Sequence, residues 1–162
     1  MIDYLRLTPM GLIAGQNRYP CSIGRGGIRS NKIEGDGATP IGDHKIVGMY
    51  YRADRIAKPN HWATPIGPND LWSDDANAPE YNKLVRTPYS FSHETLRRGD
   101  PMYDLILVTD WNYPNTVANK GSAIFVHQWR RPRYPTAGCI ALSRKHLCDI
   151  ATKISFGATL SI

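Results

Sequence analysis

The sequence predicts a mainly β fold of short strands joined by turns, with one helix near the C-terminus. The 162 residues include 14 Gly and 12 Pro, spread along the chain without a period, and both residue types interrupt helices and favour turns. Apolar residues occur mostly in short runs of strand length. A chain of ~150 residues can bury about 70% of its unfolded surface around one core, so we expect a single domain, residues 1–162.

The N-terminal third is predicted to contain short strands and glycine-rich turns. In residues 8–11, Pro and Gly stand where a type I turn favours them. Residues 24–27 and 35–40 are rich in glycine but lack the Gly-Lys-Ser/Thr sequence of a phosphate-binding loop. We therefore expect their glycines to provide backbone conformations with positive φ. The predicted strands of this part are 2–7, 19–23 and 45–51.

The rest of the chain begins with a long segment, residues 58–89, that is rich in Pro, Asn and Asp and predicts an ordered loop or lid. Residues 92–98 suggest one short helix. Ser143 is a suitable N-cap for a helix whose apolar residues continue at helical spacing to Ile154. The remaining predicted strands are 104–109, 122–127, 139–142 and 158–162.

The charge balance permits an acidic partner without naming it. Twenty Lys and Arg against 14 Asp and Glu give a formal net charge of +6, which suits nucleic acid, an anionic membrane or a carboxylate-rich substrate. No run approaches the ~18 apolar residues of a membrane helix, so no membrane partner is expected. The basic residues are dispersed except at 130–133, and no nucleic-acid-binding signature occurs, so no nucleic-acid partner is expected either.

The N-terminus carries Asp3 and Arg6 where a secretory signal would have its apolar segment. We therefore expect a cytoplasmic location, with the periplasm as the alternative if a leader has been removed. The three cysteines, Cys21, Cys139 and Cys148, are too few and odd in number for a disulfide framework. Cys139 and Cys148 with a single nearby His do not complete a zinc site, so we expect no metal and no cofactor.

One pair of residues can carry covalent chemistry. His127 ends a predicted strand, a Pro- and Arg-rich loop follows, and Cys139, preceded by Gly138, opens the next strand. A thiol becomes a strong nucleophile only as a thiolate, and a neighbouring imidazole can accept its proton. Backbone N–H groups around Gly138 and Cys139 can stabilise an oxyanion. Taken alone, such a pair is more often an inert buried cysteine beside a hydrogen-bonded histidine.

Together with its neighbours, this pair resembles a known motif. The run from Ser122 to Leu142, with His127, Thr136, Gly138 and Cys139, is similar to the catalytic signature of the YkuD-type L,D-transpeptidase family: His, a loop, Ser/Thr-x-Gly-Cys and an apolar residue. The likeness covers most of the chain, because further blocks resemble one branch of that family, namely 24–28, 35–40 and 103–108.

The resemblance implies a β-sandwich or barrel-like catalytic domain and a cysteine acyl-enzyme that acts on peptidoglycan stem peptides (muropeptides). In that family the cysteine attacks the carbonyl at the L-centre of the third residue, usually diaminopimelate, and expels the terminal D-alanine. Carried over, Cys139 is the nucleophile, His127 the general base, and Gly138 with Cys139 part of the oxyanion hole. Thr136 shapes the loop, and the backbone carbonyl of Gln128 orients the histidine. A covalent carbapenem adduct at the cysteine is also implied.

Two positions depart from the common motif. Ala137 stands where the family has a second His, and Ala141 where it has Asn or Arg. The interval between His127 and Thr136 is also shorter than in the best-known members. These differences concern the substrate cradle and the acceptor side, and they leave the His/Cys pair intact.

Five residues of the loop are candidates for binding substrate, and one of them is Thr136. Arg130, Arg131 and Arg133 suit a stem peptide rich in carboxylates, because a guanidinium binds a carboxylate at two points. A solvated basic loop is the alternative for each of them. Trp129 can line the groove or simply pack against the protein.

These observations favour an L,D-carboxypeptidase that releases D-alanine from soluble tetrapeptides during cell-wall recycling. Cross-linking needs the polymer outside the cytoplasm, so an exported L,D-transpeptidase is the first alternative. A non-catalytic peptidoglycan-binding scaffold and a basic nucleic-acid binder are the others.

Overall fold

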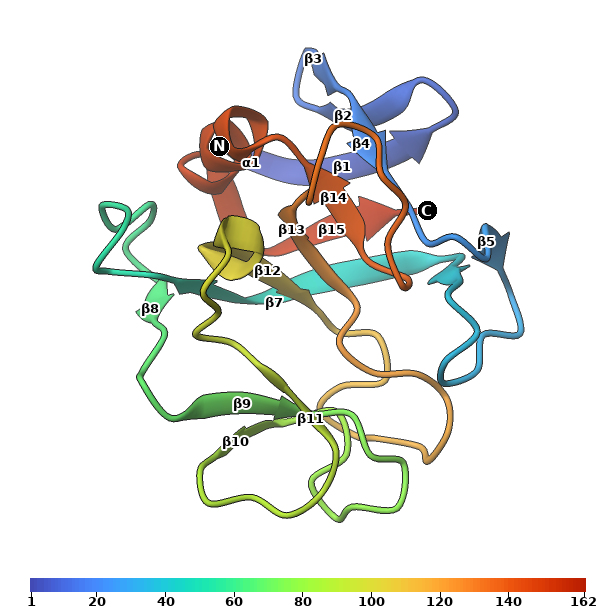
Figure 1. Ribbon diagram of the computed structural model, residues 1–162. Helices are drawn as coiled ribbons and strands as arrows, with labels where there is room; N and C mark the ends of the chain where they lie inside the picture. Colours follow the sequence, from blue (N-terminus) through green and yellow to red (C-terminus); the bar gives the residue numbers. More distant parts are fainter.

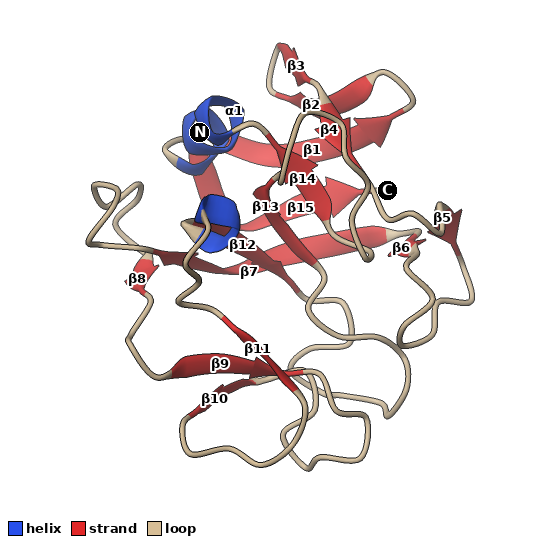
Figure 2. Cartoon of the chain, in the orientation of Figure 1, coloured by secondary structure: helices blue, strands red, loops and turns tan.

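The computed structural model describes residues 1–162 and is mainly β, as predicted (Figures 1 and 2). It contains one α-helix, α1 (Arg144–Ala151), and one short 3-10 helix, η1 (Pro101–Tyr103). The strands are β1 (Ile2–Thr8), β2 (Gly11–Ala14), β3 (Asn17–Tyr19), β4 (Cys21–Ser22), β5 (Ile28–Arg29), β6 (Thr39–Pro40), β7 (Asp43–Tyr51), β8 (Thr64–Pro65), β9 (Asp70–Ser73), β10 (Leu84–Arg86), β11 (His93–Thr95), β12 (Leu105–Thr109), β13 (Phe125–Gln128), β14 (Ile140–Leu142) and β15 (Ile154–Ser161).

Ten strands form one strongly curled sheet. Its order is β3-β2-β1-β15-β7-β12-β13-β14-β4, with β8 paired to β7. Strands β3 and β4 lie at opposite ends of this order, yet only Pro20 separates them in the chain. The sheet must therefore curl until its two ends nearly meet (Figure 1). The predicted sandwich or barrel-like architecture is confirmed.

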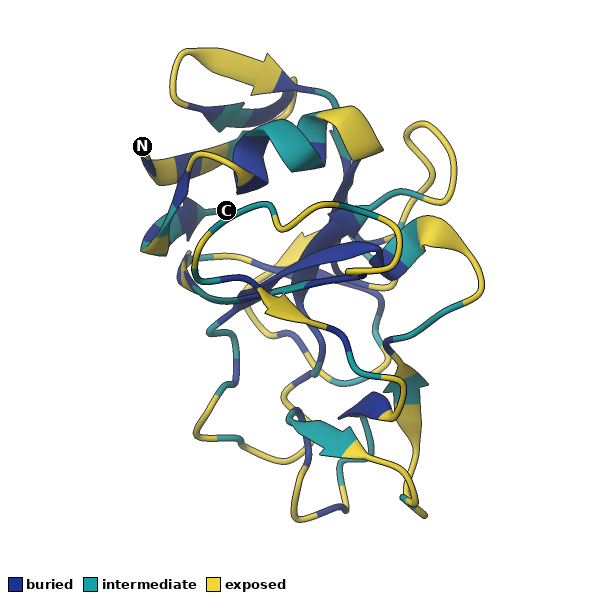
Figure 3. Cartoon of the chain, turned by 90° about the vertical axis from the view of Figure 1, so that its left-hand side faces the viewer, coloured by how far each residue is buried: buried dark blue, intermediate teal, exposed yellow.

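The main hydrophobic core lies inside this curled sheet, and α1 packs against it. Ser143 caps α1 as predicted, because its side chain accepts a hydrogen bond from the His146 N–H at 3.2 Å. Leu147 and Ile150 of the helix are buried in the core. The helix ends at Ala151, and Ile154 begins β15 instead of extending the helix. Figure 3 shows the buried residues concentrated on the central strands, and the exposed ones on connecting loops, outer strands and one part of the helix.

Strand β12 is buried on both faces. Leu105 and Leu107 face the main core, whereas Ile106 and Val108 belong to a second apolar cluster, which also contains Trp72. Side chains alternate between the two faces of a strand, so a strand covered on both sides needs a continuous apolar run. The prediction of a buried strand at 104–109 is confirmed for this reason.

The second cluster lies between the main sheet and a small sheet of order β10-β9-β11 (Figure 2). Segment 58–89, expected to be a loop, is mostly irregular but contributes β8, β9 and β10. The helix predicted at 92–98 is wrong, because residues 93–95 pair with β9 as β11. Backbone pairing with a neighbouring strand outweighs a weak local helix preference.

The glycine-rich segments serve two different purposes. Gly27, Gly35 and Gly37 have positive φ, as predicted. Gly24 and Gly26 do not. A Cβ on Gly24 would lie 2.2 Å from the Gly37 carbonyl oxygen and 2.9 Å from the Gly138 Cα, and a Cβ on Gly26 would lie 2.6 Å from the Asp36 carbonyl oxygen. The expectation of positive φ is thus wrong for these two glycines, where the cause is the close approach of backbone segments.

The Gly24→Ala substitution is therefore expected to destabilise the protein by on the order of 3 kcal/mol, because backbone atoms cannot move aside as a flexible side chain can. Urea denaturation measures this change. Gly99→Ala is the matched control: its added Cβ would meet nothing within 4 Å and its φ is not positive, so the free energy of unfolding should change by less than about 0.5 kcal/mol. Equal stability of the two variants would contradict the close-approach argument.

No helix in the structure has the length and apolar character required to cross a membrane.

Candidate active site

The side chains of His127 and Cys139 lie on the same face of the main sheet. Strands β13 and β14 are parallel neighbours, with Val126 opposite Ile140. Val126 and Ile140 point into the main core, so the alternating residues Phe125, His127 and Cys139 point the other way, toward the small sheet. The Phe125 N–H donates to the Cys139 sulfur at 3.4 Å.

Both residues line a cavity of about 710 Å³. They are largely buried at its wall, with 4% of His127 and 8% of Cys139 exposed. The cavity is bordered by the small-sheet region on one side and by the loop after β13 on the other. The thiol is therefore reached from a cavity and is not sealed inside the core.

A backbone carbonyl orients the imidazole. The Nδ1 atom of His127 lies 2.7 Å from the Gln128 carbonyl oxygen, which is the acceptor that the resemblance implies. A carbonyl oxygen only accepts, so Nδ1 carries the proton and Nε2 is left with a lone pair. The His127 ring also packs against the Tyr103 ring in a T-shaped arrangement, with the ring centroids 5.4 Å apart.

Burial holds both groups in their neutral forms. It raises the pKa of the Cys139 thiol to about 12, an effect reinforced by the negative charge of Glu94. Burial also lowers the pKa of His127 to about 4. In the resting site the thiol donates to the Ala123 carbonyl at 3.0 Å. At neutral pH the pair is therefore a thiol and a neutral imidazole that can accept a proton.

The lowered pKa of His127 predicts a loss of stability in acid. Its value falls from 6.5 to about 4 on folding, so the unfolded chain takes up a proton first as the pH decreases. This contribution is fully present above pH ~6.5 and is lost between ~6.5 and ~4, at a cost of about 3 kcal/mol. Denaturation measured at several pH values should show this slope, and His127→Gln should flatten it. Asp36 and Asp100, with pKa values lowered to about 2, act in a more acidic range.

An unchanged slope in the His127→Gln protein would contradict this assignment. The control is His93→Gln, because His93 is exposed and its variant should keep the slope of the unmodified protein.

Two threonines hold the backbone on either side of the cysteine. Buried Thr39 accepts a hydrogen bond from the Gly24 N–H at 2.9 Å and donates to the Gly138 carbonyl at 2.7 Å. Thr136 donates to the Cys139 carbonyl at 2.6 Å and accepts from the Gly138 N–H at 3.1 Å. The Gly138 amide is thus already used within the loop. Gly138 itself has φ +142°, which favours glycine.

The loop residues proposed from the sequence are placed differently from one another. Arg130 and Thr136 line the same cavity as His127 and Cys139. Arg131 instead stacks on the Tyr134 ring, 4.2 Å from its centroid, and Arg133 lines a different cavity. Half-buried Trp129 donates its backbone N–H to the Leu142 carbonyl and does not line the cavity that contains Cys139.

Several cavity residues were not singled out from the sequence: Arg25, Lys32, Glu94, Arg98 and Tyr103. They come from three separate segments, so no local spacing indicates that they meet. Arg25 and Tyr103 each had one signal, because they lie in the blocks 24–28 and 103–108 that resemble the family. Lys32 is buried and paired with Asp36 at 2.8 Å.

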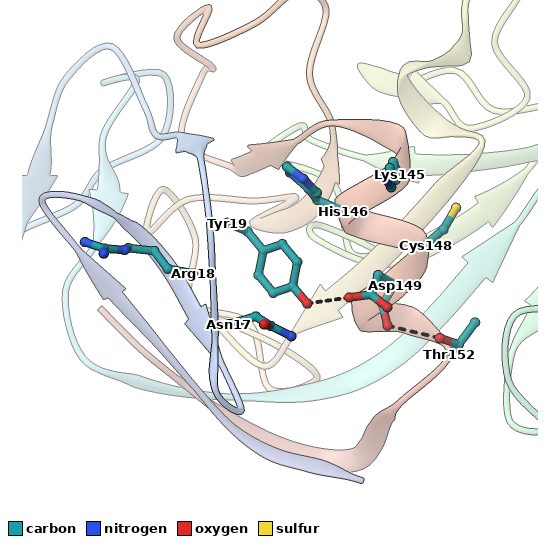
Figure 4. Close-up of a pocket in the computed structure, with 8 residues that line it drawn as sticks. All are labelled: Asn17, Arg18, Tyr19, Lys145, His146, Cys148, Asp149 and Thr152. Carbon is teal, nitrogen blue, oxygen red and sulfur yellow. Dashed lines mark hydrogen bonds between the residues drawn. The ribbon is translucent and has the colours of Figure 1, made fainter.

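A second cavity, of about 560 Å³, lies between β3 and α1 (Figure 4) and contains another Cys/His couple, Cys148 and His146. Residues two apart on a helix do not face each other. Figure 4 shows the His146 imidazole beside Tyr19, while the Cys148 sulfur points away from it. The Tyr19 hydroxyl donates to Asp149. Cys148 and His146 therefore cannot share a proton. The cavity at the end of β13, which contains Cys139 and His127, is the candidate active site.

The structure contains no group of three or more His, Cys, Asp or Glu side chains that could hold a metal ion.

The curled β sheet, with a cysteine and a histidine at the wall of one cavity, has the arrangement expected of a domain that uses a cysteine nucleophile. Residues 12–162 match the family model of the L,D-transpeptidase catalytic domain (YkuD), and the chain belongs to this family. The family comprises cysteine enzymes that act on the peptide stems of peptidoglycan. A search of curated proteins found no match.

Proposed function

We propose that the protein is an L,D-carboxypeptidase that removes the terminal D-alanine from peptidoglycan tetrapeptide stems. The observation that carries this proposal is the placement of Cys139 and His127 on one face of the sheet, at the wall of a cavity of about 710 Å³. Pockets that hold one small ligand have volumes of ~300–1,000 Å³, so the cavity suits a single stem. The family match supports cysteine catalysis on such stems.

Because Cys139 and His127 are both neutral in the resting site, the first step must combine attack by the sulfur with transfer of its proton. As the Cys139 sulfur attacks the carbonyl carbon of the L,D-peptide bond, its proton passes to Nε2 of His127, and the carbonyl π electrons move to the oxygen. The resulting oxyanion needs a donor. The Gly138 N–H is engaged by Thr136, so we assign this role to the Cys139 N–H, which has no hydrogen-bond acceptor within the protein.

Three proton transfers complete the cycle. The His127 imidazolium protonates the leaving amine, the C–N bond breaks, and D-alanine departs, leaving a thioester on Cys139. His127 then takes a proton from a water molecule whose oxygen attacks the thioester carbonyl. The C–S bond breaks, the sulfur regains the proton from His127, and the tripeptide acid is released.

Unpaired guanidinium groups can bind the carboxylates of the stem. Arg25 and Arg130 line the cavity, and neither forms an ion pair with the protein. Arg98 is paired with Asp100 at 2.6 Å. We therefore assign the binding of substrate carboxylates to Arg25 and Arg130.

We also propose that the protein acts in the cytoplasm, where it would trim soluble tetrapeptides.

Incubation with a disaccharide tetrapeptide, with and without an amine acceptor, tests the proposal by mass spectrometry. Loss of one alanine in both conditions is the expected result. A larger conjugate formed with the acceptor would instead show transpeptidation, the reaction of an exported cross-linking enzyme. Binding of the tetrapeptide without any mass change would indicate a scaffold, and would overturn the proposal. Cell fractionation tests the location, and a periplasmic protein would favour cross-linking.

A further inference from the structure

A carboxylate and a phenol form a hydrogen-bonded pair beside the catalytic residues. The Tyr103 hydroxyl, on η1, donates to Glu94 on β11. Tyr103 is 5% exposed, and both residues line the cavity that contains Cys139. The mechanism proposed above does not use either of them.

This pair connects the small sheet to the catalytic strand. Glu94 belongs to β11 of the small sheet. The Tyr103 ring packs against the imidazole of His127, which lies on β13 of the main sheet. The Arg98 guanidinium lies 5.3 Å from the centroid of the Tyr103 ring. Tyr103 is thus packed between His127 and Arg98, and its hydroxyl holds Glu94 at the boundary of the two sheets.

The charge of Glu94 acts on the nucleophile. Burial raises the pKa of Glu94, whereas the hydrogen bond from Tyr103 lowers it. When ionised, Glu94 disfavours the thiolate of Cys139, because like charges in one poorly solvated cavity repel. The other titratable and charged groups that act on Glu94 or Cys139 are Asp74, Glu34, Arg98, Lys32 and, across Tyr103, His127.

We propose that Glu94 is a positioning residue of this site: its carboxylate, held by Tyr103, strengthens the preference of the Cys139 sulfur for the thiol form that burial already favours, and this added preference is lost when the charge of Glu94 is neutralised. The nucleophile is then protected in the empty site, where an ionised thiolate would be open to oxidation or alkylation. Protonation of Glu94 removes the repulsion and raises the thiolate fraction. This inference rests on the proposed role of Cys139 as the nucleophile.

The test measures the reaction of Cys139 with 2,2′-dithiodipyridine between about pH 4 and about pH 9, a range in which the thiolate is the reacting form. The thiolate forms a mixed disulfide and expels pyridine-2-thione. Peptide mass spectrometry isolates the rate at Cys139, since Cys21 and Cys148 are half-buried and can react as well.

In the unmodified protein, a plot of the logarithm of the Cys139 reaction rate against pH is expected to change its course at the pH where Glu94 titrates; this is the bend referred to below. Below the bend, Glu94 is protonated and the rate exceeds the line extrapolated from high pH by roughly tenfold, the effect of a pKa shift of about one unit. The curve of Glu94→Gln should show no such bend. At every pH it should follow the line obtained by extending the low-pH part of the unmodified protein's curve. A further bend from His127, near pH 4, is common to both proteins.

Tyr103→Phe keeps the ring against His127 and removes the hydrogen bond to Glu94. Because that bond lowers the pKa of Glu94, its loss should move the bend to higher pH. If Glu94→Gln does not fold, this displacement still tests whether the charge of Glu94 affects Cys139. Glu80→Gln, which removes a charge from an exposed residue outside the cavity, should leave the curve unchanged.

Two results would overturn the inference. One is a Glu94→Gln curve that keeps the bend of the unmodified protein. The other is a Glu94→Gln rate that differs from the unmodified rate by the same factor at all pH values, which indicates altered access to the cysteine. Because thiol reactivity is read without substrate, failure here is separate from failure of the proposed function, which is read as release of D-alanine.

Discussion

Replacing Cys139 with serine is expected to abolish D-alanine release, with a loss of roughly 10⁴-fold or more, as is typical when a nucleophile is removed. A serine hydroxyl can keep the hydrogen bond to the Ala123 carbonyl that the thiol makes, so the fold and the cavity should persist. However, the hydroxyl is far less readily ionised than a thiol, and its buried surroundings disfavour ionisation further. Turnover of the disaccharide tetrapeptide, followed by mass spectrometry, measures the effect.

Cys148→Ser serves as the matched control, because Cys148 lies on α1 outside the candidate site. It should retain full turnover. Intact-protein mass after exposure to a carbapenem gives a second readout: we expect one adduct on the unmodified protein and on Cys148→Ser, and none on Cys139→Ser. Undiminished turnover by Cys139→Ser would refute the assignment of the nucleophile.

Loss of the imidazole is the second large effect. We expect His127→Ala to lower kcat/KM by ~10²–10⁴-fold, the range for a missing general base. The neutral thiol, with its pKa raised to about 12, then has no neighbouring group to accept its proton. Steady-state kinetics on the tetrapeptide at neutral pH measures the loss, and circular dichroism shows whether the variant is folded.

A chemical rescue separates the loss of the base from a change of structure. Added imidazole can occupy the space left by the side chain and accept the proton, so it should restore part of the activity of His127→Ala. It should not restore Cys139→Ser. His146→Ala, in the cavity beside α1, is expected to behave like the unmodified protein. If His127→Ala retained turnover within about tenfold of normal, the general-base role would be excluded.

Several features were predictable because their signals are local. Ser143 and the apolar spacing that follows it determine α1, since a cap and an amphipathic turn depend on residues close in the chain. The continuous apolar run of β12 reflects burial on both faces. The Cys/His pair was found because both residues lie at the ends of recognisable strands, in a motif that the family shares.

Other features were missed because they depend on distant partners. Strands β9 and β11 have little apolar alternation, and they form because each supplies backbone hydrogen bonds to the other. Gly24 was assigned to positive φ, whereas its actual constraint is the approach of residues 37 and 138. Contacts between segments so far apart leave no mark in local spacing.

The amino-acid sequence by itself determined the strand-rich character of this chain, its C-terminal helix, and the two residues best suited to covalent chemistry. Only the tertiary structure decided that these two side chains share one face, that Arg130 but not Arg133 lines their cavity, and that Glu94 and Tyr103 adjoin them. The physical reason is that the tendencies of single residues act over a few positions, whereas burial and charge interactions depend on which segments the curled sheet brings together.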